Sequence, residues 1–184
     1  MDYLKEFCSK LQNLDRSRHT YTIFKDFLTL STCSIANVCL FVGNKRARLR
    51  FGPLPTSRFY KSDEIEQRYL EIIKQYTKEQ AEEFSKLLAF LVEALEQEYQ
   101  DFLGKVFMQM SFGSSANGQF FTPYHVSKLM SEINFAETKN ILKDNNFITL
   151  SEPCCGSGGI IIAFAETLKE QGYNYQHQLF VEKQ

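Results

Sequence analysis

Apolar positions recur along the first hundred residues at the three- and four-residue steps of amphipathic helices. The pattern is clearest at the start of the chain, at Leu4, Phe7, Leu11 and Leu14. It continues to about residue 42, and Asp15 or Ser17 is the expected break between a first and a second helix. Residues 43–60 are predicted to form a loop, because two prolines stand within Gly52–Pro55.

Two further helices are predicted over residues 63–75 and 77–101. The second opens on a capping box, in which Thr77 and Gln80 bond each other's backbone N–H groups. An apolar stripe follows at Phe84, Leu87, Leu88, Leu91, Val92 and Leu95. This stripe suits a partner-binding helix or the core of a helical bundle, and its spacing favours the bundle core.

From residue 101 onward, strands are expected among the helices. One helix is predicted over residues 101–111, and another begins at Pro123 after a Thr122 cap. The apolar positions of this second helix are Val126, Leu129, Met130 and Ile133. A short helix near residues 138–144 then leads into a strand over 147–150.

After this strand comes a glycine-rich turn, Ser151–Gly159, and then a helix expected over 159–171. Gly172 stands where glycine commonly closes a helix. Residues 175–181 are predicted as a second strand, closed by Glu182. The region therefore has the strand, turn, helix, strand order of an α/β fold.

Composition limits the classes of function. With 184 residues, of which 43% are hydrophobic, the chain suits one domain or one domain with a small helical extension. The net charge of −1 argues against strong DNA binding by this chain alone. One basic cluster contains Lys45, Arg46, Arg48, Arg50 and Arg58. A solvated surface is favoured there over phosphate contacts, because a short charge run specifies little.

The cysteines and the chain start bear on location. The five cysteines are odd in number, and the adjacent pair Cys154 and Cys155 does not suit a shared zinc ion, so free thiols in a reducing compartment are expected. The start of the chain lacks a signal-peptide pattern, and no apolar run is long enough to span a membrane. We expect a cytoplasmic protein with no metal site and no membrane partner.

The turn between the two strands carries the strongest chemical signal. Gly156, Gly158 and Gly159 allow backbone N–H groups and a helix N-terminus to approach a ligand closely. Glu152 ends the first strand and Glu182 the second, and an acid at the latter place can bond ribose hydroxyls. Read alone, the turn could be an ordinary connection and Glu182 a solvated carboxylate. Their combination favours a nucleotide-type cofactor.

A second segment with a chemical signal is Gly118–Pro123. Phe120 and Phe121 cannot both be buried by one helix face, so one could meet the apolar part of a ligand. Thr122 at a helix N-terminus could receive a carboxylate. The alternative is a hydrophobic staple, in which Phe121 packs on the first helical turn.

Together, Gly118–Pro123 and Ser151–Gly159 resemble the amino-half signature of adenine-N6 DNA methyltransferases of the kind found as modification subunits of type I restriction systems. The resemblance runs from about Asp101, with its D-F-L-G-K-V-F lead-in, to Glu182. It implies S-adenosylmethionine as cofactor. It implies a helical N-terminal region, residues 1–100, followed over 101–184 by the incomplete start of a Rossmann-like AdoMet-binding domain. The fold class expected is thus α plus partial α/β.

The resemblance also implies a role for each matching residue. Phe121, Thr122 and Pro123 would fold over the methionine part of the cofactor, and Glu182 would hold the ribose. The cofactor turn would be formed by Glu152, Pro153, Gly156, Ser157 and Gly158. Glu152 stands where many members of the family have Asp.

The catalytic element of the family, Asn or Asp followed by Pro-Pro and an aromatic residue, does not occur in this sequence. The four prolines are never consecutive. No catalytic residue is therefore assigned, and the chain alone is expected to be inactive. A truncated reading frame or an expressed fragment would account for this.

The expected partners are DNA, as for the complete family, and a specificity or restriction subunit or a second copy that covers the exposed sheet. The alternative function is a non-catalytic interaction module whose helical region docks a partner chain. A NAD-dependent oxidoreductase is disfavoured, because the turn is not G-x-G-x-x-G. The sequence does not specify a DNA recognition site.

Overall fold

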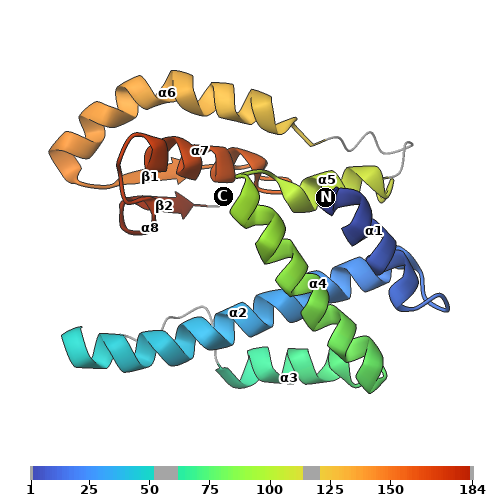
Figure 1. The fold of residues 1–184 in the computed structure, drawn as a ribbon. Helices are drawn as coiled ribbons and strands as arrows, with labels where there is room; N and C mark the ends of the chain where they lie inside the picture. Colours follow the sequence, from blue (N-terminus) through green and yellow to red (C-terminus); the bar gives the residue numbers. More distant parts are fainter. Residues whose placement is uncertain (1, 52–61, 114–120, 183–184) are drawn as a thin grey trace. The chain divides into compact units, whose positions relative to one another are not determined.

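The computed structural model of the chain describes residues 2–51, 62–113 and 121–182; for 38–51 and residue 62 it describes the backbone alone. These residues form eight helices and two strands (Figure 1). In chain order they are α1 (Tyr3–Leu14), α2 (Thr20–Phe51), α3 (Ser62–Ile73), α4 (Lys78–Gln97), α5 (Phe102–Gln109), α6 (Tyr124–Asn145), β1 (Ile148–Ser151), α7 (Gly159–Glu170), α8 (Tyr175–Gln178) and β2 (Leu179–Glu182).

The chain divides into two compact units. Residues 5–90 form one, here called the helical unit, and residues 1–4 with 91–184 form the other, the C-terminal unit. Helix α4 crosses the division. The boundary expected at residue 100 divides the helical region from the start of the cofactor-binding domain. That division stays a prediction.

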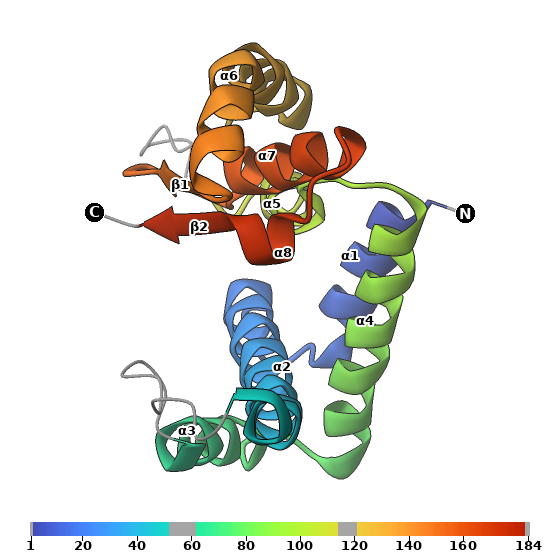
Figure 2. The same ribbon diagram turned by 90° about the vertical axis from the view of Figure 1, so that its left-hand side faces the viewer.

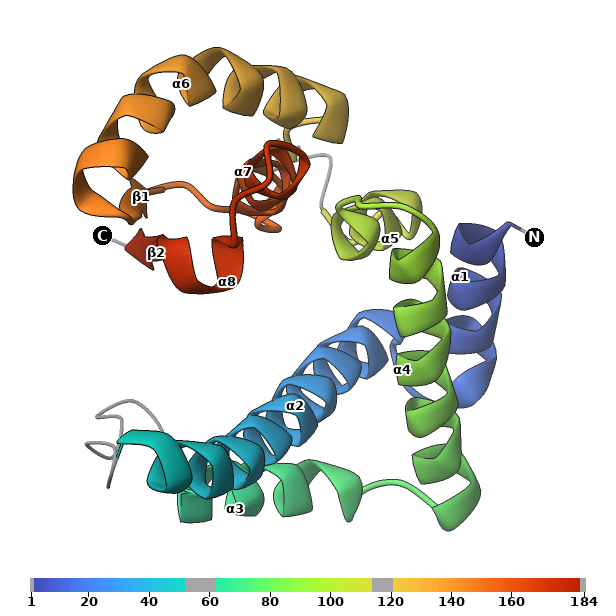
Figure 3. The same ribbon diagram turned by 60° about the vertical axis from the view of Figure 1, so that its left-hand side comes forward.

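The helical unit has a core of large apolar side chains. Phe7 and Phe27 pack edge to face with ring centroids 5.3 Å apart. α1 runs beside α4, and α3 beside α2, where Asn37 donates to Glu66 at 3.0 Å (Figure 3). The buried apolar side chains of the unit include Phe7, Leu11, Ile23, Phe24, Phe27, Phe84 and Leu87. Burial of this kind is the main term that stabilises a helical bundle.

The expected break between α1 and α2 is confirmed at Asp15. Its carboxylate accepts hydrogen bonds from the Ser17 backbone N–H at 2.9 Å and from the Ser17 hydroxyl at 2.6 Å. Both bonds lower the pKa of the Asp15 carboxyl, because they favour its charged form. The local bonds hold the chain in a turn and end α1.

The loop expected over residues 43–60 is wrong in its first half, since α2 continues to Phe51. Lys45–Arg50 contains good helix formers, and the first helix-breaking residue pair is Gly52-Pro53. Four residues of the basic cluster therefore lie in a helix. Arg58 lies outside the described residues.

The capping box of α4 is confirmed. The Thr77 N–H donates to Gln80 Oε1 at 2.9 Å, and the Gln80 N–H donates to Thr77 Oγ1 at 3.3 Å. The stripe is narrower than expected, because Val92 and Leu95 are 47% and 41% exposed. Its buried positions are Phe84, Leu87, Leu91 and Ala94. The predicted helix over 77–101 ends early, at Gln97, and Asp101 starts the separate helix α5.

In the C-terminal unit, β1 and β2 pair in parallel, with Ile148 opposite Leu179 and Ser151 opposite Glu182. Helix α7 connects them, and α6 passes over α7 (Figure 2). One apolar cluster joins these elements: Phe135, Leu142, Ile148, Phe164 and Leu168, with Leu150, Tyr173, Tyr175 and Leu179 around it. The cluster fixes the helices on the small sheet.

Two predictions about where the elements of this unit break and begin were wrong. α6 is one helix through the expected break near 138, because it contains no Pro or Gly and the Thr138 hydroxyl bonds back to Asn134 O at 3.0 Å. The second strand starts only at Leu179. Before it, Gln178 Oε1 accepts from the Asn174 N–H at 2.8 Å and stabilises the short helix α8. The predicted α7 and its Gly172 end, with φ +82°, are confirmed.

The buried face of α6 does not follow its apolar positions. Val126, Leu129, Met130 and Ile133, the apolar positions of this helix, are 37%, 56%, 43% and 67% exposed. The buried positions are instead Ser127, Ser131, Phe135, Thr138 and Leu142. The small hydroxyl side chains pack on α7, whose buried positions include Gly159, Ala163 and Thr167. Small residues on both helices allow a close approach.

Within the described ranges, no helix combines the length and the hydropathy that spanning a lipid bilayer requires.

Candidate functional site

The carboxyl ends of the two strands bring two predicted site residues to one edge of the sheet. Glu182 is the last residue of β2, as expected, and Glu152 directly follows β1. The Glu152 N–H donates to Glu182 O at 3.3 Å, which extends the parallel pairing by one bond. In parallel α/β sheets, ligands bind outside this end of the strands.

The glycine turn leaves β1 in a conformation that depends on its glycines. Glu152 Oε1 accepts from the Cys154 N–H at 3.0 Å and starts the turn. Gly156 and Gly158 have φ +50° and +86°, values that favour glycine. Gly158 is the N-cap of α7, and its N–H donates to Cys155 O at 2.6 Å. The first turn of α7 consequently begins at the end of the glycine turn.

The Phe121 side chain packs against the glycine turn at Gly156. Its ring lies 5.0 Å from that of Phe107, centroid to centroid, so α5 supports it. A Cβ atom on Gly156 would lie 3.1 Å from Cδ1 of Phe121, closer than side chains normally approach. The backbone angle of Gly156 therefore favours glycine, and a larger residue there would also press on the Phe121 ring.

The predicted cap at Thr122 was wrong by one residue. Pro123, with ψ 138°, occupies the N-cap position, and its carbonyl accepts from the Val126 and Ser127 N–H groups at 2.9 and 3.2 Å. The Pro123 side chain makes no capping hydrogen bond to this helix end. Thr122 is exposed. Gly118, Gln119 and Phe120, the first part of the predicted loop, lie outside the described residues.

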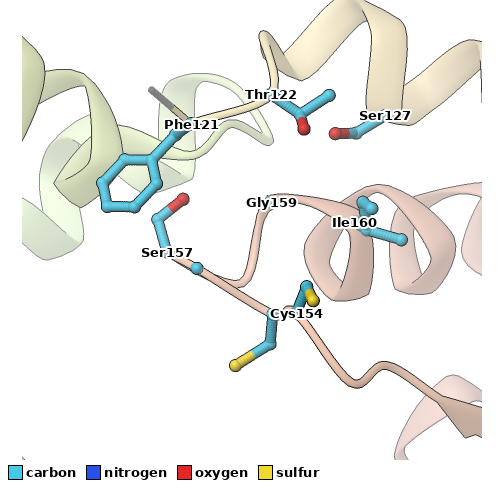
Figure 4. Close-up of a pocket in the computed structure, with 9 residues that line it drawn as sticks. Phe121, Thr122, Ser127, Cys154, Ser157, Gly159 and Ile160 are labelled. Atoms are coloured by element: carbon cyan, nitrogen blue, oxygen red, sulfur yellow. The ribbon is translucent and has the colours of Figure 1, made fainter. Parts of the chain in front are cut away.

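These segments line one pocket, shown in Figure 4. Phe121, Thr122 and Ser127 approach it from the α6 side, and the glycine turn approaches from the opposite side. The lining residues are Phe121, Thr122, Ser127, Cys154, Cys155, Gly156, Ser157, Gly159 and Ile160. Its volume is about 90 Å³. Sites for whole small molecules enclose roughly 300–1,000 Å³, so the pocket suits one end of a larger ligand.

The structure thus joins Phe121, Thr122, Gly156 and Ser157 in one pocket. The other predicted site residues do not line it: Pro123, Glu152, Pro153, Gly158 and Glu182. Gly158 shapes the turn, Glu152 and Glu182 lie at the strand ends, and Pro153 is exposed.

Two polar residues of this site were missed by sequence reasoning. Ser127 is fully buried and lines the pocket, and its Oγ has no hydrogen-bond partner among the residues that the structure describes. A buried hydroxyl without a partner is costly, and a ligand atom could satisfy it. Asp101 is 5% exposed and accepts hydrogen bonds from the Gly104 N–H, at 2.8 Å, and from the Ser157 hydroxyl.

The sequence contains a signal for only part of this arrangement. Asp101 before a helix is a common N-cap, which could have placed it at the start of α5. Its contact with Ser157, 56 residues away along the chain, has no local signature. Ser127 is a small polar residue one position after Val126, and nothing in its sequence surroundings marks it as buried.

A polar network holds the start of α6 against α7 beside the pocket. The Tyr124 hydroxyl donates to Glu166 Oε2 at 2.9 Å, and Lys128 Nζ lies 3.1 Å from Glu166 and 2.5 Å from Glu170. Burial and the hydrogen bond to Glu166 raise the pKa of Tyr124 well above its usual value. Burial tends to lower the pKa of Lys128, but its bonds to Glu170 and Glu166 outweigh burial and raise it.

Cys154 is exposed and Cys155 half-buried at the pocket, while Cys8 and Cys33 are buried; all four are free thiols. Among the described residues, no group of three or more His, Cys, Asp or Glu side chains could hold a metal ion.

Comparison with known proteins identifies one family. Residues 93–183 match the model of the N-6 DNA methylase family, from within α4 to just past β2. No curated protein and no solved structure matches the chain significantly. This part of the chain is therefore an adenine-N6 DNA methyltransferase-like region.

Proposed function

We propose that this adenine-N6 DNA methyltransferase-like region, residues 93–183, is the cofactor-binding part of a site-specific DNA methyltransferase with S-adenosylmethionine as its cofactor. The observation that carries the proposal is that Phe121 and Thr122 line the same pocket as the glycine turn, although the two segments are distant in sequence. In this proposal, β1, α7 and β2 are the beginning of a Rossmann-like sheet.

The residues of the pocket fit one end of this cofactor. Positive φ angles at Gly156 and Gly158 keep side chains away from the turn, and Phe121 offers an aromatic wall. The unpartnered Ser127 hydroxyl offers a hydrogen bond to a polar group. We assign the methionine end of the cofactor to this pocket, with Phe121, Thr122 and Pro123 on one side and the turn from Glu152 to Gly158 on the other.

Glu182 is assigned to the ribose hydroxyls, since an acid at the end of the second strand has this role in nucleotide-binding α/β folds. When bound, S-adenosylmethionine supplies a methyl group for transfer to an adenine amino group. Holding that adenine beside the methyl group is the task of the Asn/Asp-Pro-Pro element, which this sequence does not contain. The chain alone is accordingly proposed to bind cofactor without methylating DNA.

The proposed partners follow from the family and from exposed apolar side chains. DNA is the substrate of a complete enzyme, within a restriction-modification system in the cytoplasm. Phe180 and Val181 on β2 are 55% and 44% exposed, and Phe147, directly before β1, is 49% exposed. These side chains favour a protein partner, either a specificity or restriction subunit or a second copy. The second candidate function is a non-catalytic interaction module in which residues 1–100 dock a partner chain, and the exposed side chains of Ile35, Val92 and Leu95 in that region support it.

The test is calorimetric titration of the full chain with S-adenosylmethionine and S-adenosylhomocysteine. We expect micromolar binding that is lost in Gly158→Leu and in Glu182→Ala. The matched controls are Gly172→Leu, which has a similar φ of +82° and equally open space, and Glu137→Ala, an exposed acid on α6. Both controls should bind like the wild type. Absence of binding by the wild type would refute the proposal and leave the interaction module.

A further inference from the structure

Asp101 is the buried acid next to the glycine turn, and its surroundings are unusual for a carboxylate. With 5% of its surface exposed, it has no ion pair to a basic side chain among the residues that the structure describes. Its partners are the Gly104 N–H on Oδ1 and the Ser157 hydroxyl on Oδ2. A buried charge is costly unless hydrogen bonds compensate it, so these two bonds keep the side chain in place.

The two bonds connect two elements. Oδ1 caps α5, because Asp101 is the N-cap residue of that helix. Oδ2 reaches the turn that precedes α7. A Cβ atom on Gly159 would lie 3.3 Å from Oδ2 and 3.7 Å from Ser127 Oγ, so Gly159 leaves the space in which the carboxylate meets α7. One side chain therefore holds the glycine turn on α5, which also supports Phe121 through Phe107.

The direction of the Ser157 bond has a chemical consequence. A carboxylate only accepts hydrogen bonds, whereas a hydroxyl has one proton and two lone pairs. Ser157 gives its proton to Asp101, so it presents only lone pairs to the pocket that it lines. A ligand group that meets Ser157 must then donate a hydrogen bond, as an ammonium or a hydroxyl group does.

We infer that Asp101 is the positioning residue of the glycine turn: acting through the Ser157 hydroxyl, it fixes the turn on α5 and makes Ser157 an acceptor for a donor group of the ligand. The first half concerns the chain without ligand. The second half rests on the proposed function, since it takes S-adenosylmethionine or its product as the ligand.

Amide hydrogen exchange of the full chain, without ligand, tests the first half. Asp101→Ser keeps an N-cap oxygen but is too short to reach Ser157, and Ser157→Ala keeps the cap and removes the turn's hydroxyl. We expect each variant to speed exchange of the amides at residues 154–160 about tenfold, the size expected for one hydrogen bond to a charged group. The double variant should be no faster than the faster single variant.

The matched control is Ser85→Ala on the exposed face of α4, which should leave exchange at the turn unchanged. An unchanged exchange rate at the turn in Ser157→Ala would overturn the first half. It would also be overturned if the rate increase in the double variant equalled the product of the two single increases. Ser157→Ala alone decides this point if Asp101→Ser fails to fold.

Asp101→Asn tests the second half. The asparagine has the same shape as the aspartate, and its amide oxygen can still accept from the Gly104 N–H. Its NH₂ group takes the place of Oδ2 and donates to the Ser157 hydroxyl, so the serine proton turns toward the pocket. We expect exchange at the turn close to that of the wild type, with S-adenosylhomocysteine binding weakened at least tenfold in calorimetry. If Asp101 had only a structural role, Asp101→Asn would change both amide exchange at the turn and S-adenosylhomocysteine binding, or would change neither. Either result overturns the second half.

The controls separate this inference from the proposed function. A wild-type chain that does not bind S-adenosylhomocysteine overturns the proposed function and the second half together, and the exchange experiment still decides the first half. Wild-type binding with full affinity in Asp101→Asn overturns the second half and leaves the proposed function intact.

Discussion

The helical unit and the α6–α7 pair of the C-terminal unit differ in how far small hydroxyl side chains contribute to their buried contacts. The helical unit buries large apolar groups such as Phe7, Ile23 and Phe27. The α6–α7 pair buries serine, threonine, alanine and glycine beside the cluster residues Phe135, Leu142, Phe164 and Leu168, while the large apolar side chains of the first half of α6 face outward. An apolar stripe thus identifies the buried face of a helix only where burial of large apolar groups is what joins the helices.

The hydroxyl groups can be buried here because most of them bond within their own helix. The Ser131 hydroxyl donates to Ser127 O at 2.8 Å, and the Thr167 hydroxyl donates to Ala163 O at 3.0 Å. Such bonds satisfy the hydroxyl and leave a small, locally apolar surface. Ser127 is the exception in this interface, and it is the one that lines the pocket.

The largest effect is expected from the same substitution at two isoleucines. Ile23→Ala, in the core of the helical unit, should lower the free energy of unfolding by about 2–5 kcal/mol, because it removes buried methyl groups and leaves a cavity. Ile133→Ala on α6, at a residue 67% exposed, should change it by less than about 0.5 kcal/mol. Urea denaturation followed by circular dichroism measures both. A large loss in Ile133→Ala would show that this face of α6 is covered in solution.

An intermediate effect is expected from enlarging a small residue. Ala163→Leu should lower the free energy of unfolding by about 1–3 kcal/mol, since Ala163 is fully buried and leucine has no space there. Ala136→Leu, on the exposed surface of α6, is the matched control and should be close to neutral. Denaturation curves of the two variants decide the matter. Equal stability of both would contradict the close packing of α6 on α7.

The smallest effect is a dependence on pH that both units share. The Tyr76 hydroxyl donates to Asp26 at 2.6 Å in the helical unit, and Tyr124 donates to Glu166 in the C-terminal unit. Burial and these bonds raise the pKa of both tyrosines. In the folded chain these tyrosines keep their protons at a pH, above about 10, at which the unfolded chain releases them. Their contribution to the free energy of unfolding is therefore complete below about pH 10 and falls as the pH rises further.

Tyr76→Phe and Tyr124→Phe should each lower stability at pH 7 by about 0.5–1.5 kcal/mol and reduce the loss above pH 10. Thermal denaturation from pH 7 to 11 measures this, with Tyr21→Phe, an exposed tyrosine, as control. A variant whose stability falls with pH as steeply as that of the wild type would show that its hydroxyl stays bonded to solvent.

The sequence predicted well what local chemistry decides. The break at Asp15, the capping box of Thr77 and the end of α7 at Gly172 all depend on one residue and its neighbours along the chain, and all three are confirmed. The order of β1, turn, α7 and β2 was also predicted, and residues 93–183 match the expected family.

The sequence failed where contacts between distant segments decide. The buried face of α6 depends on the small residues of α7, and the place of Asp101 depends on Ser157. The start of β2 was missed because a side-chain bond of Gln178 favours helix over strand. The roles of Glu152 and Glu182 toward a cofactor stay predictions, since the structure gives their positions only.

The hydroxyl-rich contact of α6 with α7 also has a thermal consequence. Exposure of apolar surface on unfolding raises the heat capacity, whereas exposure of polar surface lowers it. Parting the helices around Ser127 and Ser131 exposes serine together with alanine and glycine, so the two contributions partly cancel there. This part of the contact should add little to the heat-capacity change of the chain, whereas the phenylalanine-rich core of the helical unit should add much more.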